Sequence, residues 1–470
     1  MKLIATGRSA RMRWVGVVLA LGFLASACGT RLPHAEHVAA AGGTAKAATA
    51  GGTAGGTSGD ESSAGGTSGG GATGTGATGA AGTTGGDAGA TGAGDATGGD
   101  AGNGSGAAAA NLAPLKIAMV CNCSGIAGAS FVPARESLKA WASMVNARGG
   151  IGGHPVDLLI GDDGSEGARD LSLTQDFVEN QGAVAIVNYF GAAGGPPAVA
   201  AYAEQHHIPV IGGAAFDAEF NSSPNMFPQT TGRTNAYYAS AVSMRDHGYT
   251  KIAIVYCTEG AVCKENADAF RKEAEALGMT IVYSAGVSLV QPDFTAECLN
   301  ARSAGAQAFY PQADGNSVNR LARSCSRQGY NAGYFVTAPA PDPDPVLEGA
   351  VTATPSFPWM LTSGSPAIEE YANAMATYAK GAPVNGFTTY GWVTGKLIEA
   401  AAANLSAVPT SQDLLNGLWA IQGNTLGGIS PPLTFVQGQN QPEANCAYYM
   451  QIQNGQWTAP QGADLIGCRP

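Results

Sequence analysis

Acidic and histidine side chains that could act in catalysis or bind a metal stand side by side at two points. Asp162 and Asp163 follow a short apolar run, so they close a predicted strand. Neighbouring side chains of a strand point to opposite faces, which favours turn and capping roles over a cooperating acid–base pair. His206 and His207 end a predicted helix, and no third ligand stands at metal-binding spacing. The sequence therefore predicts no metal site and no catalytic acid pair.

Motifs for redox, nucleotide or nucleophilic chemistry are equally incomplete. Cys121 and Cys123 lack the C-x-x-C spacing of redox thiols, and the nearby turn has no G-x-G-x-x-G fingerprint. Residues 66–70 fit G-x-S-x-G, but no strand precedes them, as a nucleophile elbow requires. Residues 391–397 (GWVTGKL) lack the spacing and the Ser or Thr of a phosphate loop. We expect neither an enzyme nor a cofactor.

Residues suited to binding a small ligand follow the predicted strands instead. Open α/β sheets bind ligands at the carboxyl ends of their strands, where loops from different strands converge. The candidates at these positions are Ser124, Gly125, Phe131, Tyr189, Gly191, Ala192, Ala193, Ala214, Phe216, Tyr256, Glu259 and Asp314.

These candidates indicate an amphiphilic ligand. The backbone amides of residues 191–193, close to a helix that starts at Pro196, suit a carboxylate or carbonyl group. Glu259 or Asp314 would pair with an ammonium group. An apolar part of the ligand would pack against Phe131, Tyr189, Phe216, Tyr237 and Tyr256. The alternatives are ordinary core packing for the aromatic residues and solvated loops for the acids.

The elements that must position these residues begin with residues 115–163. Residues 115–121 form a short apolar run with the length of a buried strand. We expect the next helix to carry Pro133 in its first turn and to stop at Gly149 and Gly150. A second strand covers residues 156–160. A strand, a helix and a strand with short connections make a βαβ unit of a parallel sheet.

The alternation of strands and helices continues along the chain and predicts an α/β fold with two lobes. Further strands of a first lobe (residues 113–232) are expected at 183–190, 208–212 and 225–229. Strands of a second lobe (residues 233–345) are expected at 251–257, 280–284, 307–312 and 334–337. Residues 346–470, with strands expected at 349–355, 432–436 and 447–453, are too few for a third domain, so we expect them to complete both lobes.

The N-terminal region has the composition of an export signal followed by a tether. Residues 14–25 are an uncharged apolar run behind a basic start, too short to span a bilayer. The run leads to Cys28, so residues 1–27 resemble a lipoprotein signal peptide, with a plain secretory signal as the alternative. Residues 28–112 are rich in Gly, Ala and Thr, and we expect a disordered tether. A net charge of −11 argues against a nucleic-acid partner.

The remaining cysteines of an exported chain favour disulfides. Of nine cysteines, eight remain when Cys28 is set aside. The pairs that lie close in the sequence are Cys257 with Cys263, Cys298 with Cys325, and Cys446 with Cys468, which leaves Cys121 for Cys123. Other connectivities are possible in principle, so this pairing is a hypothesis.

The order of these segments resembles periplasmic binding proteins of the leucine/isoleucine/valine type. NARGGIGGHPVDLLIGDD (residues 146–163) is similar to a characteristic segment of that family. AVAIVNYFGAA, IPVIGGAA, KIAIVY, PDFTAEC and TTYGWVTGKLIEAA follow in the family's order. The resemblance implies two Rossmann-like lobes joined by three crossover strands, with ligand bound between them.

The resemblance also implies a role in solute uptake. Such proteins deliver solute to the permease subunits of an ABC importer, and lipidated members sit on the extracytoplasmic side of the membrane. Relatives that bind branched-chain amino acids carry Ser or Thr hydroxyls where this sequence has Ala192, Ala193, Ala214 and Ala215. These alanines weaken the case for an α-amino acid, and we expect a small amphiphilic solute, either an amino acid or an amide-like compound. The alternatives are a ligand sensor with a membrane signalling partner and, as a third class, an enzyme on this scaffold.

Overall fold

The computed structural model describes residues 112–125, 128–337, 339 and 342–469, all within the unit formed by residues 100–470. The predicted signal peptide, Cys28 and nearly all of the predicted tether lie outside the described residues.

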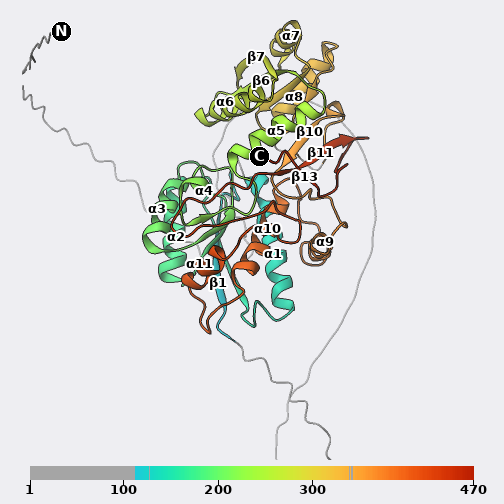
Figure 1. The fold of residues 1–470 in the computed structure, drawn as a ribbon. Helices are drawn as coiled ribbons and strands as arrows, with labels where there is room; N and C mark the ends of the chain where they lie inside the picture. The colour runs from blue at the N-terminus through green and yellow to red at the C-terminus, as the bar shows by residue number, and fades with distance from the viewer. Residues whose placement is uncertain (1–111, 126–127, 338, 340–341, 470) are drawn as a thin grey trace, which may run out of the picture. The chain divides into compact units, whose positions relative to one another are not determined.

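The first lobe is built on a parallel sheet of five strands (Figure 1). Its strands are β1 (Leu115–Cys121), β2 (Val156–Asp162), β3 (Ile186–Tyr189), β4 (Val210–Gly213) and β5 (Met226–Phe227), in the order β2-β1-β3-β4-β5. Cys121 pairs with Asp162, and Tyr189 pairs with Gly213, so the ends of four neighbouring strands lie at one edge. We call this the carboxyl edge of lobe 1.

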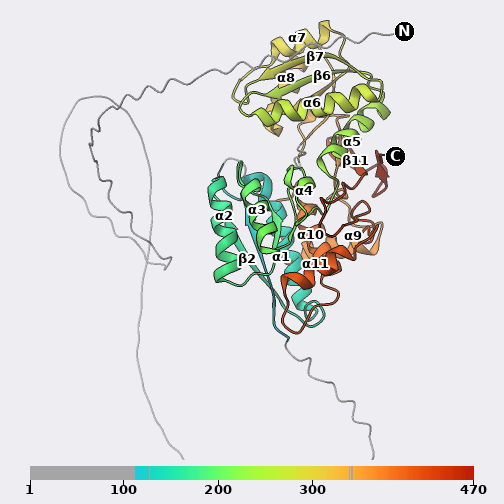
Figure 2. The same cartoon turned by 60° about the vertical axis from the view of Figure 1, so that its left-hand side comes forward.

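Helices cover both faces of this sheet (Figure 2). On one face lie α1 (Gly128–Ala147) and, from the end of the chain, α9 (Pro366–Tyr378), α10 (Thr388–Ala401) and α11 (Ser411–Trp419). On the other lie α2 (Gly167–Gln175), the π-helical turn Asp176–Asn180 and α3 (Pro196–His206), with the short α4 (Glu219–Ser222) nearby. Apolar residues of β1 point alternately into these two cores, which explains its nearly complete burial.

The start of α1 differs from the prediction. The helix begins at Gly128, so Pro133 lies inside it rather than in its first turn. Proline cannot donate the backbone hydrogen bond expected there, but it stays near the N-terminus, where few such bonds are lost. The end of the helix matches the prediction, since Gly149 and Gly150 have positive φ angles of 97° and 84°.

Two glycines of α10 explain the GWVTGKL segment. A side chain on Gly391 would collide with the carbonyl oxygen of Ala134, and one on Gly395 would collide with the ring of Trp141. Both partners belong to α1, so the glycines allow α1 and α10 to pack closely. The segment is a helix-packing surface in the middle of α10.

The second lobe contains a parallel sheet and an antiparallel extension. β6 (Lys251–Cys257), β7 (Thr280–Val287), β8 (Ala308–Gln312) and β9 (Gly333–Tyr334) have the order β7-β6-β8-β9. A bridge between Phe335 and Val351 leads to β10 (Val351–Thr354), which pairs with β11 (Ala447–Gln453). β12 (Gln456–Thr458) and β13 (Leu465–Ile466) pair with β11 and were not predicted.

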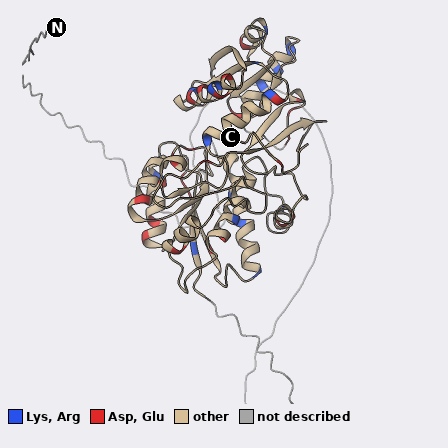
Figure 3. Cartoon of the chain, in the orientation of Figure 1, with Lys and Arg blue, Asp and Glu red and all other residues tan. Residues whose placement is uncertain are grey.

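The helices of the second lobe are α5 (Arg233–Asp246), α6 (Ala261–Ala276), α7 (Thr295–Ser303) and α8 (Gly315–Arg327), and a 3-10 turn covers Pro345–Leu347. Charged side chains of both signs lie along α6 (Figure 3), while Phe270 and Ala274 on it are buried. This is the pattern of a helix with one face in water and one on the sheet.

Three chain segments that cross between the lobes meet at Thr231. Its backbone bridges to Ala444, and its hydroxyl donates to the carbonyl oxygens of Pro355, at 3.3 Å, and of Cys446. Each crossing segment therefore touches the others. The predicted strand at 432–436 is wrong: this region holds only a bridge between Leu433 and Asn424, because Pro431 and Pro432 cannot donate ladder hydrogen bonds.

The described residues contain four disulfides, in the pairing that the sequence suggests. They join Cys121 to Cys123, Cys257 to Cys263, Cys298 to Cys325 and Cys446 to Cys468. The first two have an equivalent place in the two lobes. Each starts at the last residue of the first strand of its lobe and closes the turn that follows.

Candidate ligand site

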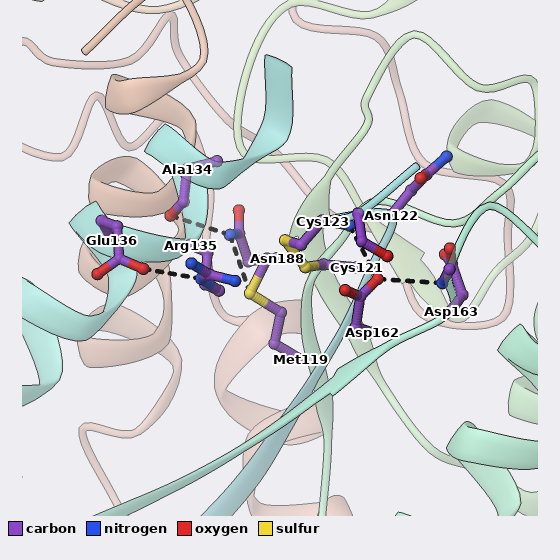
Figure 4. Close-up of a disulfide and its surroundings, with 12 residues drawn as sticks. Met119, Cys121, Asn122, Cys123, Ala134, Arg135, Glu136, Asp162, Asp163 and Asn188 are labelled. Atoms are coloured by element: carbon purple, nitrogen blue, oxygen red, sulfur yellow. Dashed lines mark hydrogen bonds and ion pairs between the residues drawn. A yellow bond between two sulfur atoms is a disulfide. The ribbon is translucent and has the colours of Figure 1, made fainter. Parts of the chain in front are cut away.

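Two carboxylates, Asp162 and Asp163, fasten together the turns after β1, β2 and β3. Figure 4 shows Asp162 and Asp163 beside the disulfide of Cys121 and Cys123. Asp162 accepts hydrogen bonds from the amides of Cys123 (3.2 Å) and Gly164 (3.0 Å). Burial raises the pKa of Asp162, but bonds from Gly164, Ser124 and Cys123 outweigh this effect and lower it below its ordinary value. This carboxylate is therefore charged and holds the first two turns together.

Asp163 links the same assembly to the turn after β3. It is fully buried, and it accepts from the amides of Ser165 (2.7 Å) and Ala192 (3.1 Å). The Ser165 hydroxyl in turn donates to the Asn122 side chain (2.7 Å) and to the Ser124 carbonyl (3.1 Å). Both acids are thus structural, as the sequence predicts.

Behind this turn lies a second buried acid, Asp170 on α2. It is fully buried and accepts a hydrogen bond of 2.8 Å from the Tyr189 hydroxyl. Burial, and next the hydrogen bond with Asp163, raise its pKa to about 7. A proton on Asp170 avoids placing two negative charges in one buried site.

Five aromatic side chains gather at the carboxyl edge of lobe 1, and we call them the aromatic cluster. They are Phe131, Phe190, Phe216, Phe387 and Tyr390. Ring centroids are 4.8 Å apart for Phe131 and Phe190 and 5.2 Å for Phe131 and Phe387. Phe216 is 39% exposed and lies 6.1 Å from Phe387. The cluster is an apolar surface that is anchored in the core and open at one end.

The structure brings several predicted residues to this edge. Ser124 and Gly125 are exposed in the turn after β1, and Gly125 has a φ of 71°. A side chain on Gly125 would come within 2.5 Å of the Ser165 hydroxyl, so the turn depends on glycine. Phe131 and Phe216 belong to the aromatic cluster, while Ala193 is exposed in the turn after β3.

Other predicted residues are enclosed by packing. Tyr189, Ala192 and Ala214 are buried, and Tyr189 points toward α2 rather than toward the aromatic cluster. The cause lies at Asn188, whose φ of 49° interrupts the alternation of the strand. Its side chain donates to the Ala134 carbonyl of α1, so Phe190, and not Tyr189, faces the cluster.

The predicted anion site beside the start of α3 keeps two of its three amides. The first two residues of this helix are Pro196 and Pro197, which have no N–H group. The amides of Ala198 and Val199 both donate to the Gly195 carbonyl, and the Ala192 amide donates to Asp163. The first turn of α3 therefore offers no donor of its own, but among the described residues the amides of Gly191 and Ala193 in the preceding turn have no hydrogen-bond partner, so the anion site stays a prediction.

In lobe 2, local hydrogen bonds occupy both predicted acids. Glu259 accepts from the Ser288 hydroxyl and the Leu289 amide, each at 2.7 Å. The hydrogen bond from Ser288 is the largest cause that lowers the pKa of Glu259. Asp314 caps α8 by accepting from the amides of Asn316 (2.9 Å) and Ser317 (3.2 Å). Both carboxylates tie turns of lobe 2 together.

The two remaining aromatic candidates are half-buried in lobe 2. Tyr256 lies in β6, and Tyr237 lies on α5, where its hydroxyl accepts a hydrogen bond of 3.4 Å from Arg233. Sequence reasoning missed Phe190, Phe387 and Tyr390. The period-2 pattern of β3 predicted that Tyr189, and not Phe190, would face the ligand. Phe387 and Tyr390 were missed because they come from the last third of the chain, where Phe387 precedes α10 and Tyr390 lies on it.

Two structural findings concern metals and membranes. Among the described residues, no three His, Cys, Asp or Glu side chains gather as a metal site. No helix in that same part of the chain has the length and apolar character needed to cross a membrane.

Comparison with known proteins places this geometry in a family. A curated relative from Pseudomonas aeruginosa, named "Amino acid binding protein", is 22% identical over 278 residues, which are 55% of this chain and 70% of that protein. The structure resembles a branched chain amino acid ABC transporter protein from Thermus thermophilus with bound valine (TM-score 0.63, 17% identity, 75% of this chain and 97% of that one).

It also resembles an ABC transporter solute binding protein from R. palustris in complex with benzoate (TM-score 0.60, 17% identity, 76% of this chain and 100% of that one). The two-lobed α/β fold described above is the fold of these proteins. The family model "Periplasmic binding protein" matches residues 114–456. The chain therefore belongs to the periplasmic binding protein family, whose members are extracytoplasmic solute-binding proteins.

Proposed function

We propose that this protein captures a small amphiphilic solute, an amino acid or an amide-like compound, between its lobes and delivers it to an ABC importer. The observation that carries the proposal is the carboxyl edge of lobe 1. Three turns fastened by Asp162 and Asp163 stand there beside the aromatic cluster, whose Phe216 keeps exposed surface. The apolar part of the solute packs on that cluster, and polar groups of the turns orient its other end.

The relatives support this class of ligand. The protein from P. aeruginosa is named for amino acids, the structure from T. thermophilus holds valine, and the one from R. palustris holds benzoate. Valine and benzoate are both small carboxylates with an apolar body. A site with an aromatic wall and few charges suits such molecules.

The junction at Thr231 supports closure of the lobes on the solute. The three crossing segments touch one another there, so they offer a common pivot for a rotation between the lobes. A ligand that contacts both lobes binds the closed state better and shifts the equilibrium toward it. The permease subunits then receive the closed form.

The N-terminal region completes the proposal. Residues 1–27 are removed as a lipoprotein signal peptide, and Cys28 carries the lipid that anchors the chain on the extracytoplasmic side of the membrane. Residues 28–112 form a tether that lets residues 113–470 sample the surrounding solution. Labelling with a radioactive fatty acid in the wild type, and its loss in Cys28→Ala, test the anchor.

A thermal-shift screen tests the binding role. The panel contains valine, leucine, phenylalanine, glutamine, leucinamide and benzoate, and a ligand that binds only the folded state raises the melting temperature. At a ligand concentration of 100 times Kd the gain is about 2.7 kcal/mol. We expect at least one amino acid or amide to stabilise the protein, and no effect from any member would contradict the proposal.

Uptake of the radiolabelled hit by cells that lack this gene tests delivery. We expect uptake to fall and to recover when the gene is restored. Normal uptake together with a lost transcriptional response to the same solute would instead indicate the sensor alternative.

A further inference from the structure

The disulfide between Cys121 and Cys123 closes the shortest loop of the four that the structure describes. Its cysteines are 2 positions apart in the sequence, whereas those of Cys298–Cys325, which joins α7 to α8, are 27 positions apart. In the chain-entropy account, a disulfide stabilises a fold by restricting the unfolded chain, and the effect grows with the length of the closed loop. The Cys121–Cys123 bond therefore contributes less to global stability than the long-range bond does.

The Cys121–Cys123 bond fixes the backbone at the point where β1 leaves the sheet. Inside the closed loop, the Asn122 amide donates to the carbonyl oxygen of Phe190, at 2.6 Å, just after β3. The Cys123 amide donates to the carboxylate of Asp162, at 3.2 Å, the last residue of β2 (Figure 4). The loop therefore holds contacts to the ends of both neighbouring strands, and the disulfide keeps its two donors in place.

The same bond packs in the core that supports the aromatic cluster. Cys121 is 0% and Cys123 is 8% exposed, and both belong to the buried core that contains Phe190 and has Phe131 packed against it. A side chain on Gly128, the first residue of α1, would come within 2.7 Å of the Cys123 carbonyl oxygen. The turn and the helix that carries Phe131 are thus in close contact, so the disulfide supports the polar turn and the apolar surface together.

Lobe 2 carries a disulfide of the same kind at the equivalent place. Cys257 ends β6, and its bond to Cys263 ties the strand to the first turn of α6 across a separation of 6 positions. The turn between them contains Glu259, which is bonded to the turn after β7. The other two disulfides join α7 to α8 and fasten the end of the chain to Cys446. The short-loop bonds therefore stand at the turns that follow the first strand of each lobe.

We infer that the Cys121–Cys123 disulfide preorganises the carboxyl edge of lobe 1 for ligand. It holds the turn that carries Ser124 and Gly125 in its bound shape before the solute arrives, while the two cysteines stay buried. The inference rests on the proposed function and adds two positioning residues to it. Without the bond the turn samples more conformations, and a ligand must order it at a cost in affinity.

Calorimetry on two double variants tests the inference, with leucine, leucinamide and benzoate as probes. In Cys121→Ala/Cys123→Ala we expect the affinity for the probe that binds the wild type to fall about 10-fold, which equals about 1.4 kcal/mol. Cys298→Ala/Cys325→Ala is the matched control, because it also replaces two buried cysteines. We expect the control to keep the wild-type affinity and to lose more melting temperature than the first variant, since it opens the longer loop.

Hydrogen exchange in the ligand-free wild type gives a second measurement that needs no variant. We expect NMR to show that the amides of Asn122 and Cys123 are already protected, because their acceptors are in place. In Cys121→Ala/Cys123→Ala the Asn122 amide and the amide of residue 123 should exchange faster and become protected when the probe binds. Circular dichroism and melting temperature show that both double variants fold.

The remaining outcomes separate the inference from the proposed function. Wild-type affinity in Cys121→Ala/Cys123→Ala, or an equal loss of affinity in both double variants, overturns the inference and leaves the proposed function standing. Free thiols at Cys121 and Cys123, a first variant that does not fold, or wild-type amides that are protected only with ligand overturn the inference as well. Wild-type protein that binds none of the probes overturns both.

Discussion

Two desolvated acids near the carboxyl edge of lobe 1, Asp170 and Asp217, and two exposed acids of lobe 2, Glu259 and Asp293, have opposite environments, while Asp162 of lobe 1 has a lowered pKa like the second pair. In lobe 1, burial raises the pKa of both Asp170 and Asp217 to about 7. In lobe 2, hydrogen bonds lower the pKa of Glu259, and bonds led by that from Thr295 lower the pKa of Asp293 to about 2. The first pair is desolvated and close to neutral, and the second is exposed and charged.

The difference indicates unequal roles for two otherwise similar halves. Each lobe starts with a strand whose last cysteine forms a disulfide across the following turn. In lobe 1 that turn is joined to its neighbours by buried carboxylates and lies beside the aromatic cluster. In lobe 2 it is held by an exposed glutamate. Lobe 1 therefore presents a preorganised surface, and lobe 2 supplies a solvated cover.

The largest effect should come from removing the centre of the aromatic cluster. Phe190 is 1% exposed and contacts Phe131, Phe387 and Tyr390. Phe190→Ala removes these contacts and leaves a cavity, so we expect the free energy of unfolding to fall by about 3–5 kcal/mol. Urea denaturation followed by tryptophan fluorescence measures it.

A matched change in lobe 2 sharpens this result. Val290 follows β7 and is 87% exposed, so Val290→Ala should change the free energy of unfolding by less than about 0.5 kcal/mol. Equal losses for the two variants would mean that the edges of the two lobes are equally packed.

The pH dependence of stability should reveal the buried acid pair. Because the pKa of Asp170 is raised from 3.8 to about 7, the folded state binds a proton that the unfolded state releases. This contribution is complete below about pH 3.8 and is lost as the pH rises toward 7, with a slope of at most about 1.4 kcal/mol per pH unit. Unfolding curves recorded between pH 4 and pH 8 measure it.

Asp170→Asn is the control for this slope. Asparagine keeps a donor toward Asp163 and an acceptor for the Tyr189 hydroxyl but does not titrate. We expect the variant to lose less stability than the wild type over this pH range. An unchanged slope would assign it to other groups, among which Asp217 is the first to test.

Two glycines that each directly precede a helix allow a smaller but cleaner comparison. Gly195 precedes α3, and Gly260 precedes α6. A Cβ on Gly195 would collide with the carboxylate of Asp170, whereas the nearest atom to a Cβ on Gly260 is Cγ1 of Val262, at 3.6 Å. Gly195→Ala should therefore cost about 1–3 kcal/mol of stability through overpacking.

Gly260→Ala should be nearly neutral, because its φ of −147° is open to any residue. Thermal unfolding of the two variants under the same conditions measures the contrast. A similar loss of stability in both variants would show that glycine is needed because it starts a helix, and not because Asp170 lies against it.

The strands and helices with strong local signals were predictable from the sequence. β1, β6, β11 and α3 have the predicted bounds, because each is an apolar or helical run closed by clear breakers. The strand expected at 432–436 lacks such support, since its apolar residues pack without a neighbouring ladder. β12 and β13 are short and pair only after the chain has returned to lobe 2.

The site was less predictable than the fold. One left-handed residue, Asn188, sends Tyr189 into the core and Phe190 into the aromatic cluster, and a period-2 pattern contains no sign of it. Phe387 reaches the cluster from the far end of the chain. Asp217 stands one residue after a predicted candidate, Phe216, but the burial that raises its pKa depends on the tertiary environment.

We expect the smallest effect on stability and ligand affinity at Glu259, and this variant is the strictest test of the difference between the lobes. The pKa of Glu259 is lower in the folded state than its ordinary value of 4.5, so the carboxylate stabilises the fold at pH values above 4.5. This stabilisation is lost as the pH falls through the folded-state pKa, which is the reverse of the behaviour of Asp170. Glu259→Gln keeps an acceptor for Ser288 and Leu289, so we expect little change in melting temperature at pH 7. Calorimetry should show unchanged affinity for leucine in this variant, because solvent screens the carboxylate and hydrogen bonds from Ser288 and Leu289 already occupy it. A large loss of affinity would make lobe 2 the side that recognises charge and would reverse the roles of the two edges.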